Sequence, residues 1–215
     1  MFTVSTAASS TALTTRTRVK AVLGISGASE DAYLDILIAQ ASAFVCDRLN
    51  VATAADGTRT LGRETLIETI TLREKRPLLQ LARVPLASIT SIYEDDSASA
   101  LVEDTDFEAI KPSGFLRRKS ASVPGLWSAR KIVVTYVAGW RLPGDSGRSL
   151  PEPIESAVFD LIKNARAMQS RSADIKAEEV NGVGRTEYFA NIMNVPGAMP
   201  PETAAKLEPY VHFRP

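Results

Sequence analysis

The sequence predicts an α+β fold: a helical bundle of two long helices plus short helices, with an inserted antiparallel β-sheet or sandwich and extended termini. Two observations predict this class. Apolar residues recur at three- and four-residue spacing over residues 29–50 and again over 151–172, which is the period of an amphipathic helix. Between them, residues 64–140 change to short runs rich in Ile, Val, Thr and aromatics, divided by turn residues, which is typical of strands.

The chain begins with residues 1–13, which are rich in Ser, Thr and Ala without periodicity and predict a flexible N-terminal arm. A helical part follows over residues 14–63. Its first helix is short, because Thr14 or Thr15 can cap its start and Gly24 can end it.

Each of the two long helices has its own start signal. Ser29 can cap the first and Asn50 can close it, while Pro151 and Pro153 suit the first turn of the second, over residues 151–172. The first apolar stripe comprises Leu34, Leu37, Ile38, Ala41, Val45 and Leu49, and the second comprises Ile154, Ala157, Val158, Leu161, Ile162, Ala165 and Met168. We expect the two stripes to pack on each other, with a sheet or neighbouring subunits covering the remaining apolar surface.

The β-rich insertion over residues 64–140 is expected to hold five or six short strands. The stretch Pro112-Ser113-Gly114 lies between two such runs and predicts a hairpin turn. After the last long helix, residues 173–215 are predicted to form an extended C-terminal arm that contains one short helix.

The charge balance limits the classes of partner. Twenty-five basic and 25 acidic residues give a formal net charge of zero, which argues against a nucleic-acid-binding module because such proteins carry a basic excess. The N-terminus lacks the pattern of a secretory signal, and no stretch reaches the length needed to cross a bilayer, so we expect synthesis in a cytoplasm and no membrane partner.

The residues that carry catalysis and metal binding are scarce in this chain. Cys46 is the only cysteine and His212 the only histidine, so one chain cannot build a zinc site from these residue types. His212 lies near the C-terminus, where a rigid nucleophile–base pair is hard to hold. Asp95, Asp96, Glu103, Asp104 and Asp106 form an acidic cluster that we interpret as solvated turn residues rather than a cation site. We therefore predict no catalytic, cofactor-binding or metal-binding residues, no cofactor, and a protein that is not an enzyme.

A run of basic residues, Arg117, Arg118 and Lys119, is the one candidate contact for DNA, with Arg130 and Lys131 across a predicted loop. No aromatic residues are interleaved with them for base stacking. The interpretation of this patch stays open between a surface that faces another subunit and one that faces DNA.

Six phrases together resemble the bacteriophage head–tail connector family, also called head-completion adaptors. They are LTTRTRVKAVLGISGASEDAYLDILIAQASAFVCDRL at the start, RVPLASITSIYED, DFEAIKPSGFLRR and KIVVTYVAGW in the β region, and LPEPIESAVFDLIKNARAM followed by MPPETAAKLEPYVHFRP at the end. Their order and spacing, over about residue 13 to 215, carry the resemblance.

The resemblance implies a structural adaptor subunit in the virion neck, at the head–tail interface. It would form a homo-oligomeric ring, of twelve copies, under the portal protein, extend the channel through which genomic DNA passes without sequence readout, and give the next neck or tail-completion protein a docking platform. The residues that it assigns to portal docking lie in the segment 196–215, and they are Leu207, Tyr210, Val211 and Phe213.

Three alternatives remain. Another neck component of the same virion, such as a stopper or tail-completion protein, belongs to the same structural class, but the helix–insert–helix order favours the adaptor. An enzyme or regulatory domain would need a catalytic constellation, and a nucleic-acid-binding module would need a basic excess.

Overall fold

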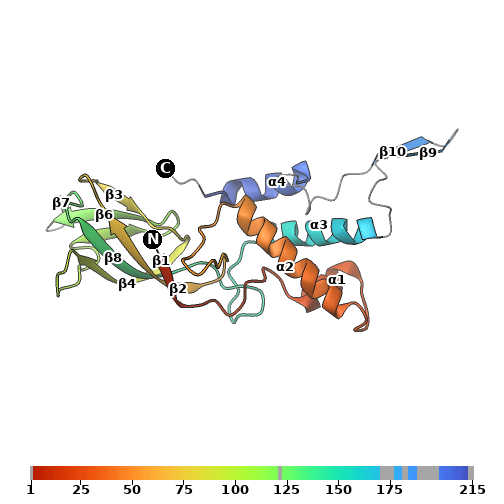
Figure 1. Cartoon of the computed structure of the whole chain (residues 1–215), viewed down its shortest axis with the longest axis horizontal. Coiled ribbons are helices and arrows are strands. Elements are labelled where there is room, and N and C mark those ends of the chain that lie inside the picture. Colours follow the sequence, from red (N-terminus) through yellow and green to blue (C-terminus); the bar gives the residue numbers. More distant parts are fainter. Residues whose placement is uncertain (1, 121–122, 170–176, 181–183, 188–198, 213–215) are drawn as a thin grey trace. The chain divides into compact units, whose positions relative to one another are not determined.

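The computed structural model of the chain describes residues 2–120, 123–169, 177–180, 184–187 and 199–212 (Figure 1). The chain divides into two compact units, each with elements of its own. The β unit comprises residues 1–10 and 52–141, and the helical unit comprises residues 11–51 and 142–215.

The first sheet of the β unit has four antiparallel strands in the order β1-β2-β8-β4. The strands span Phe2–Thr6 (β1), Glu64–Thr71 (β2), Leu86–Glu94 (β4) and Lys131–Ala138 (β8). Strand β8 is central and pairs with β2 along its whole length, from Glu64 opposite Ala138 to Thr71 opposite Lys131. Strand β1 covers only part of β2, because its pairing stops at Phe2 opposite Glu68.

The second sheet has the order β3-β6-β5, with β7 also paired to β6. Its strands span Leu78–Gln80 (β3), Phe107–Ile110 (β5), Phe115–Ser120 (β6) and Val123–Pro124 (β7). The predicted hairpin turn is confirmed, because β5 and β6 are antiparallel neighbours with Ile110 opposite Phe115. Gly114 closes this turn at a φ of 69°, a conformation that glycine adopts without steric cost.

Both sheets of the β unit contribute to one hydrophobic core. Along β8, alternate side chains point inward, so that Ile132, Val134 and Tyr136 are fully buried, as the two-residue period of a strand requires. The core also holds Trp127, whose indole N–H donates to the backbone carbonyl of Leu116 at 3.1 Å.

Two sets of buried polar side chains lie in this core, one around Tyr136 and one around Arg83. The Tyr136 hydroxyl donates to Glu68 Oε2 at 2.7 Å, and the backbone N–H of Ala82 donates to the same oxygen at 2.9 Å. Burial is the main reason why the pKa of Tyr136 lies above its ordinary value. Arg83 is buried beside Glu64, with its Nη1 3.5 Å from Oε2 of that carboxylate, and its guanidinium lies over the Phe2 ring, 5.5 Å from the centroid.

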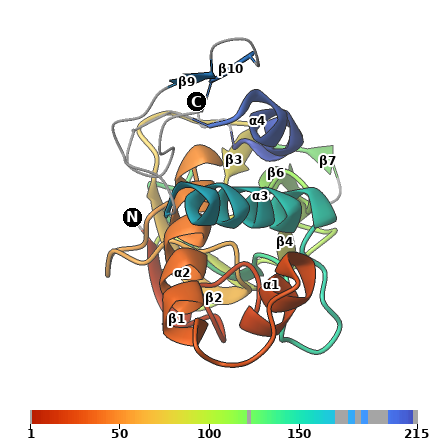
Figure 2. The same ribbon diagram turned by 90° about the vertical axis from the view of Figure 1, so that its right-hand side faces the viewer.

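The helical unit contains four α-helices and a 3₁₀ turn among its described residues. They span Arg16–Leu23 (α1), Asp31–Arg48 (α2), Glu152–Gln169 (α3), Pro201–Leu207 (α4) and Glu208–Tyr210 (η2). A two-stranded hairpin, Ala177–Val180 (β9) with Gly184–Glu187 (β10), belongs to the same unit. Helices α2 and α3 lie against each other and cross, and α4 packs on α3 (Figure 2).

The short helix α1 has the ends that its sequence predicts. The side chain of Thr15 accepts a hydrogen bond from the backbone N–H of Arg18, and Gly24 ends the helix at a φ of 66°. Arg16 forms ion pairs with Asp31 and Asp35, which fixes α1 against the first turns of α2.

A buried carboxylate on α3 joins three segments of the helical unit. The Glu155 side chain is fully buried and accepts hydrogen bonds from Thr14 Oγ1 at 2.7 Å and from Arg18 Nε and Nη2 at 2.7 and 2.8 Å. Arg148 Nη2 lies 2.8 Å from Glu155 Oε2, the oxygen that also accepts from Arg18 Nη2. The loop before α1, α1 itself and the loop before α3 therefore meet at one residue.

The predicted fold class, a bundle of two long helices with an inserted sheet and extended termini, is wrong. The described chain has four separate short helices, and the β region is a compact unit with two four-stranded sheets and its own core. Two 18-residue helices span only about 27 Å each, so α1 and α4 are needed beside them. The N-terminus is also not an extended arm, because β1 joins the first sheet and Phe2 is buried there.

Candidate interaction surfaces

The C-terminal segment is the first candidate surface, and its helix is held by α3. Leu207 and Thr203 on the inner side of α4 are buried. Lys206 Nζ donates to Ser156 Oγ at 3.0 Å and forms an ion pair with Asp160, both on α3. The structure thus places Leu207, one of the predicted docking residues, inside the helical unit, where it fixes α4.

The residues after α4 lie against the end of α2. The backbone N–H of His212 donates to the carbonyl of Leu49 at 3.1 Å, and Asn50 Nδ2 donates to the His212 carbonyl at 3.1 Å. These bonds hold Tyr210 and Val211 half-buried at the surface of the unit. Phe213, the fourth predicted docking residue, lies outside the described residues. The structure therefore brings Tyr210 and Val211 together as an accessible pair.

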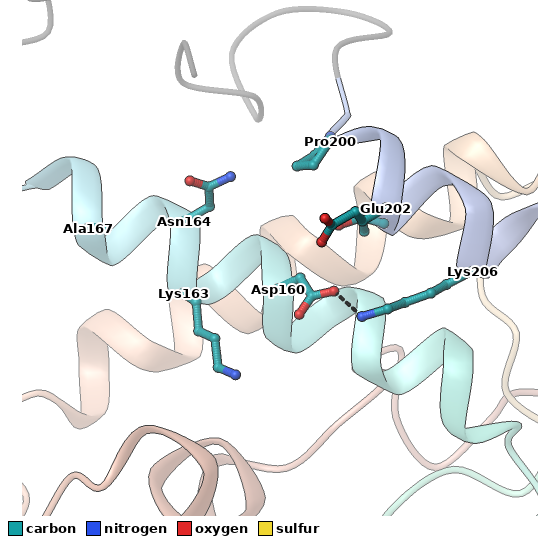
Figure 3. Close-up of a pocket in the computed structure, with 8 residues that line it drawn as sticks. Asp160, Lys163, Asn164, Ala167, Pro200, Glu202 and Lys206 are labelled. Atoms are coloured by element: carbon teal, nitrogen blue, oxygen red, sulfur yellow. Dashed lines mark hydrogen bonds and ion pairs between the residues drawn. The ribbon is translucent and has the colours of Figure 1, made fainter. Parts of the chain in front are cut away.

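An open depression of about 380 Å³ lies between α3 and α4. It is lined by Asp160, Lys163, Asn164, Ala167, Pro200, Glu202, Thr203 and Lys206. The ion pair between Asp160 and Lys206 crosses it, and Lys163 extends away from α4 (Figure 3). A shallow, mixed-charge lining of this kind offers no group positioned for catalysis and no apolar pocket for a small molecule.

The basic run Arg117, Arg118 and Lys119 lies on β6, where acidic side chains neutralise it. Arg118 pairs with Glu94 through both carboxylate oxygens, at 3.1 and 3.0 Å, and lies over the Trp127 ring. Arg117 Nη1 lies 3.3 Å and Lys119 Nζ 3.9 Å from Oε2 of a single carboxylate, that of Glu108 on β5. The run joins β6 to its neighbours and presents little uncompensated positive charge.

A group of exposed cations of the β unit without ion pairs to described residues lies elsewhere, in residues 73–76, which sequence reasoning missed. We call this stretch, Arg73-Glu74-Lys75-Arg76, the basic loop. Its side chains are all exposed, and no ion pair joins its three cations to an acidic group in the part of the chain that the structure describes. The loop follows β2 and lies beside exposed Arg130, because the backbone N–H of Leu72 donates to the Arg130 carbonyl at 2.9 Å. Three basic residues among four were the available signal.

The acidic cluster is split by the fold between structural and free groups. Asp95 Oδ1 accepts from the backbone N–H groups of Arg130 and Lys131 at 2.9 and 3.0 Å, which closes the end of β4 onto β8. Asp106 Oδ2 accepts from the backbone N–H of Val102 at 2.9 Å. Asp96 is exposed but pairs with Lys131, whose Nζ lies 3.2 Å from Asp96 Oδ1, whereas Glu103 and Asp104 are exposed without an ion pair to any residue that the structure describes.

The described residues contain no group of three or more His, Cys, Asp or Glu side chains that could hold a metal ion. Cys46 is buried in α2. Among the helices that the structure describes, none combines the length and the apolar character needed to cross a membrane.

Comparison with known proteins supplies a likeness of fold. No family model matches the sequence, and neither does any curated protein. Three solved structures contain chains of similar fold, all from gene transfer agent (GTA) particles. The neck of the empty particle with C6 symmetry gives a TM-score of 0.58 at 17% identity, the native virion gives 0.56 at 19%, and the neck of the native particle with C12 symmetry gives 0.51 at 15%. Each match covers 100% of this chain and 96% of the other. At these identities the comparison establishes that the folds are alike.

Proposed function

We propose that this chain is a structural subunit of the neck of a phage-like particle, namely a head–tail connector that forms a ring under the portal. The observation that carries the proposal is the end-to-end likeness to chains in GTA neck structures, which extends over both units of the fold. A likeness confined to one unit would leave the other unit free for a different task.

The surface chemistry supports a structural role rather than a catalytic one. In the described part of the chain the buried carboxylates serve packing: Glu155 binds two arginines, and Glu68 binds Tyr136. We assign no catalytic, cofactor-binding or metal-binding residues. A chain with zero net charge also suits a channel wall that DNA passes without being retained.

In this proposal the copies form a closed ring, of twelve subunits, with portal protein on one side and the next neck or tail-completion protein on the other. The neck structures of similar chains were computed with C6 and C12 symmetry, which supports a cyclic arrangement. The chain would be made in the host cytoplasm and would then reside in the virion neck.

Portal docking is assigned to the C-terminal segment, with Tyr210 and Val211 as the contact residues and Phe213 beyond them. Leu207 has a supporting role, since it is fully buried and holds α4 on α3. The backbone bonds between His212 and the end of α2 present the contact pair from a fixed base. Aromatic and aliphatic anchors of this kind dominate the binding energy of protein interfaces.

The direct test mixes the purified full chain with the purified portal protein of the same particle and images the products by electron microscopy. We expect a second ring stacked on the portal ring. Absence of any portal complex from the intact chain would contradict the proposal. A ring that binds only below another neck protein would instead identify the chain as a stopper or tail-completion component.

A pair of variants tests the assigned docking residues. Tyr210→Ala with Val211→Ala should weaken portal binding by about tenfold or more, because contact-centre truncations cost about 2 kcal/mol, while the melting temperature stays close to that of the wild type. Leu207→Ala is the matched control: it should lower the free energy of unfolding by about 2–5 kcal/mol, because it opens a cavity in a fully buried site. Unchanged portal binding in the double variant would remove the assignment.

A further inference from the structure

Two loops of opposite charge lie at the same end of the first sheet in the β unit. The basic loop, residues 73–76, continues from the end of β2. The acidic loop, which we define as residues 95–104, continues from the end of β4 and contains four acidic residues and no basic one. Thr71 on β2 pairs with Lys131 on β8, and Glu94 on β4 pairs with Ile132, so the two loops leave the sheet at almost the same level.

The loops lie at opposite lateral edges of that sheet end. Strand β8 lies between β2 and β4, so the strands that lead into the two loops are about 10 Å apart. On one side β4 is the edge strand. On the other side β2 is itself the edge at this end, because the pairing with β1 stops at Phe2 opposite Glu68, three residues before Thr71. Positive charge is therefore exposed at one edge and negative charge at the other.

An exposed apolar side chain lies in the acidic loop and another lies beside the basic loop. Val102 in the acidic loop is 58% exposed. Beside the basic loop, Leu126 is 52% exposed, and its position is fixed because Trp127 and Arg76 exchange both backbone hydrogen bonds, at 2.8 and 3.1 Å. Apolar side chains framed by charged ones are typical of protein contacts, whereas contacts with nucleic-acid phosphates do not require them.

We propose that the basic loop of one copy of this chain docks onto the acidic loop of the next copy, so that neighbouring subunits contact each other head to tail through their β units. This inference rests on the ring proposed above and identifies one of its subunit contacts. Because the two patches differ, docking one onto the other makes a heterologous interface, which closes into a ring when the rotation between neighbouring copies permits it. The charges are complementary within one chain. Asp95 and Asp96 already have partners on β8 or beside it, so a second copy supplies a partner for Glu103 and Asp104 in the acidic loop and for the three cations of the basic loop.

Charge exchange in the full-length chain tests the contact. Self-association is measured by sedimentation velocity at about 10 mM salt, where the Debye length is about 30 Å, and again at about 1 M, where it is about 3 Å. Variant A carries Arg73→Glu, Lys75→Glu and Arg76→Glu. Variant B carries Asp96→Lys, Glu103→Lys and Asp104→Lys. Variant C carries all six substitutions. Lys111→Glu, in an exposed turn of the same unit, is the matched control for a single charge reversal.

We expect the wild type and the Lys111→Glu control to associate at low salt and to dissociate at high salt. The association constants of variants A and B at low salt should each be lower than that of the wild type by about tenfold or more, and a mixture of A with B should associate again. The association constant of variant C should return to within about threefold of the wild-type value, because the exchanged charges are again complementary.

Three results would overturn the inference: no self-association of the wild type at low salt, association of A and B equal to that of the wild type, or loss of duplex DNA binding in A with self-association unchanged. The last result would assign the basic loop to DNA. Portal binding by electron microscopy is scored separately on the same variants. If variants A and B form rings on the portal as well as the wild type does, the proposed neck function stands and only this contact is refuted. If the wild type does not bind the portal, the proposed neck function itself is refuted.

Discussion

The buried carboxylate of Glu155 gives a sharp prediction about the helical unit. Glu155→Gln removes the negative charge that pairs with Arg18 and Arg148. The glutamine side chain also carries an amide N–H₂ group, which is a donor and cannot accept the hydrogen bonds that one carboxylate oxygen now accepts. Removing one partner of a fully buried ion pair costs about 3–5 kcal/mol. Because the Arg18 side chain is 43% exposed and regains water, we expect a loss of about 2–4 kcal/mol in the free energy of unfolding.

The assay is urea unfolding followed by two signals. Far-UV ellipticity reports mainly on the helices, whereas both tryptophans of the chain, Trp127 and Trp140, lie in the β unit, so their fluorescence reports on that unit. The ellipticity transition of Glu155→Gln should move to lower urea. Glu152→Gln, one turn earlier on α3, is the control: its side chain is 73% exposed and pairs with Arg148, so its loss should stay below about 0.5 kcal/mol. Equal losses for Glu155→Gln and Glu152→Gln would refute the reasoning.

Two further predictions concern the β unit. Burial raises the pKa of Glu64, so just above the ordinary glutamate pKa the folded state holds a proton that the unfolded chain has released, and stability falls as pH rises through that range. We therefore measure the free energy of unfolding of Glu64→Gln and of the wild type by urea titration at several pH values. The difference, variant minus wild type, should increase with pH just above the ordinary glutamate pKa, and a difference that does not change with pH would contradict this prediction. Gly139→Ala should cost about 2 kcal/mol or more, because Gly139 has a φ of +98° and an added Cβ would lie 2.2 Å from the Gly62 carbonyl oxygen. Gly57→Ala, at a φ of +86° in open space, should cost only about 1 kcal/mol, and thermal unfolding that ranks Gly57→Ala as the worse change would refute this account.

Local signals in the sequence predicted local structure well. The cap at Thr15, the glycine stop at Gly24 and the turn at Gly114 depend on the conformational preferences of single residues, which are present in the sequence itself. The start of α2 shows the usual limit of such signals, because the expected cap at Ser29 precedes the observed cap, Glu30, by one residue.

The errors came from contacts between residues distant in the chain. The composition of residues 2–6 predicted a flexible arm. These residues form a strand because they pair with β2, which lies about 60 residues later in the chain. Likewise, Arg118 looks like part of a free basic patch until β6 brings it to Glu94, 24 residues away in the chain. Spacing within a segment cannot reveal such partners, so the free cations of the basic loop were overlooked for the same reason.

The most direct measurement for the central claim is a reconstruction, by electron cryomicroscopy, of the neck of the particle that encodes this chain. We predict a ring immediately under the portal in which each subunit has the β unit and the helical unit of this fold. Deletion of the gene for this chain should remove that ring from the neck. A neck complete without this chain, or its density found only outside the neck, would contradict the account.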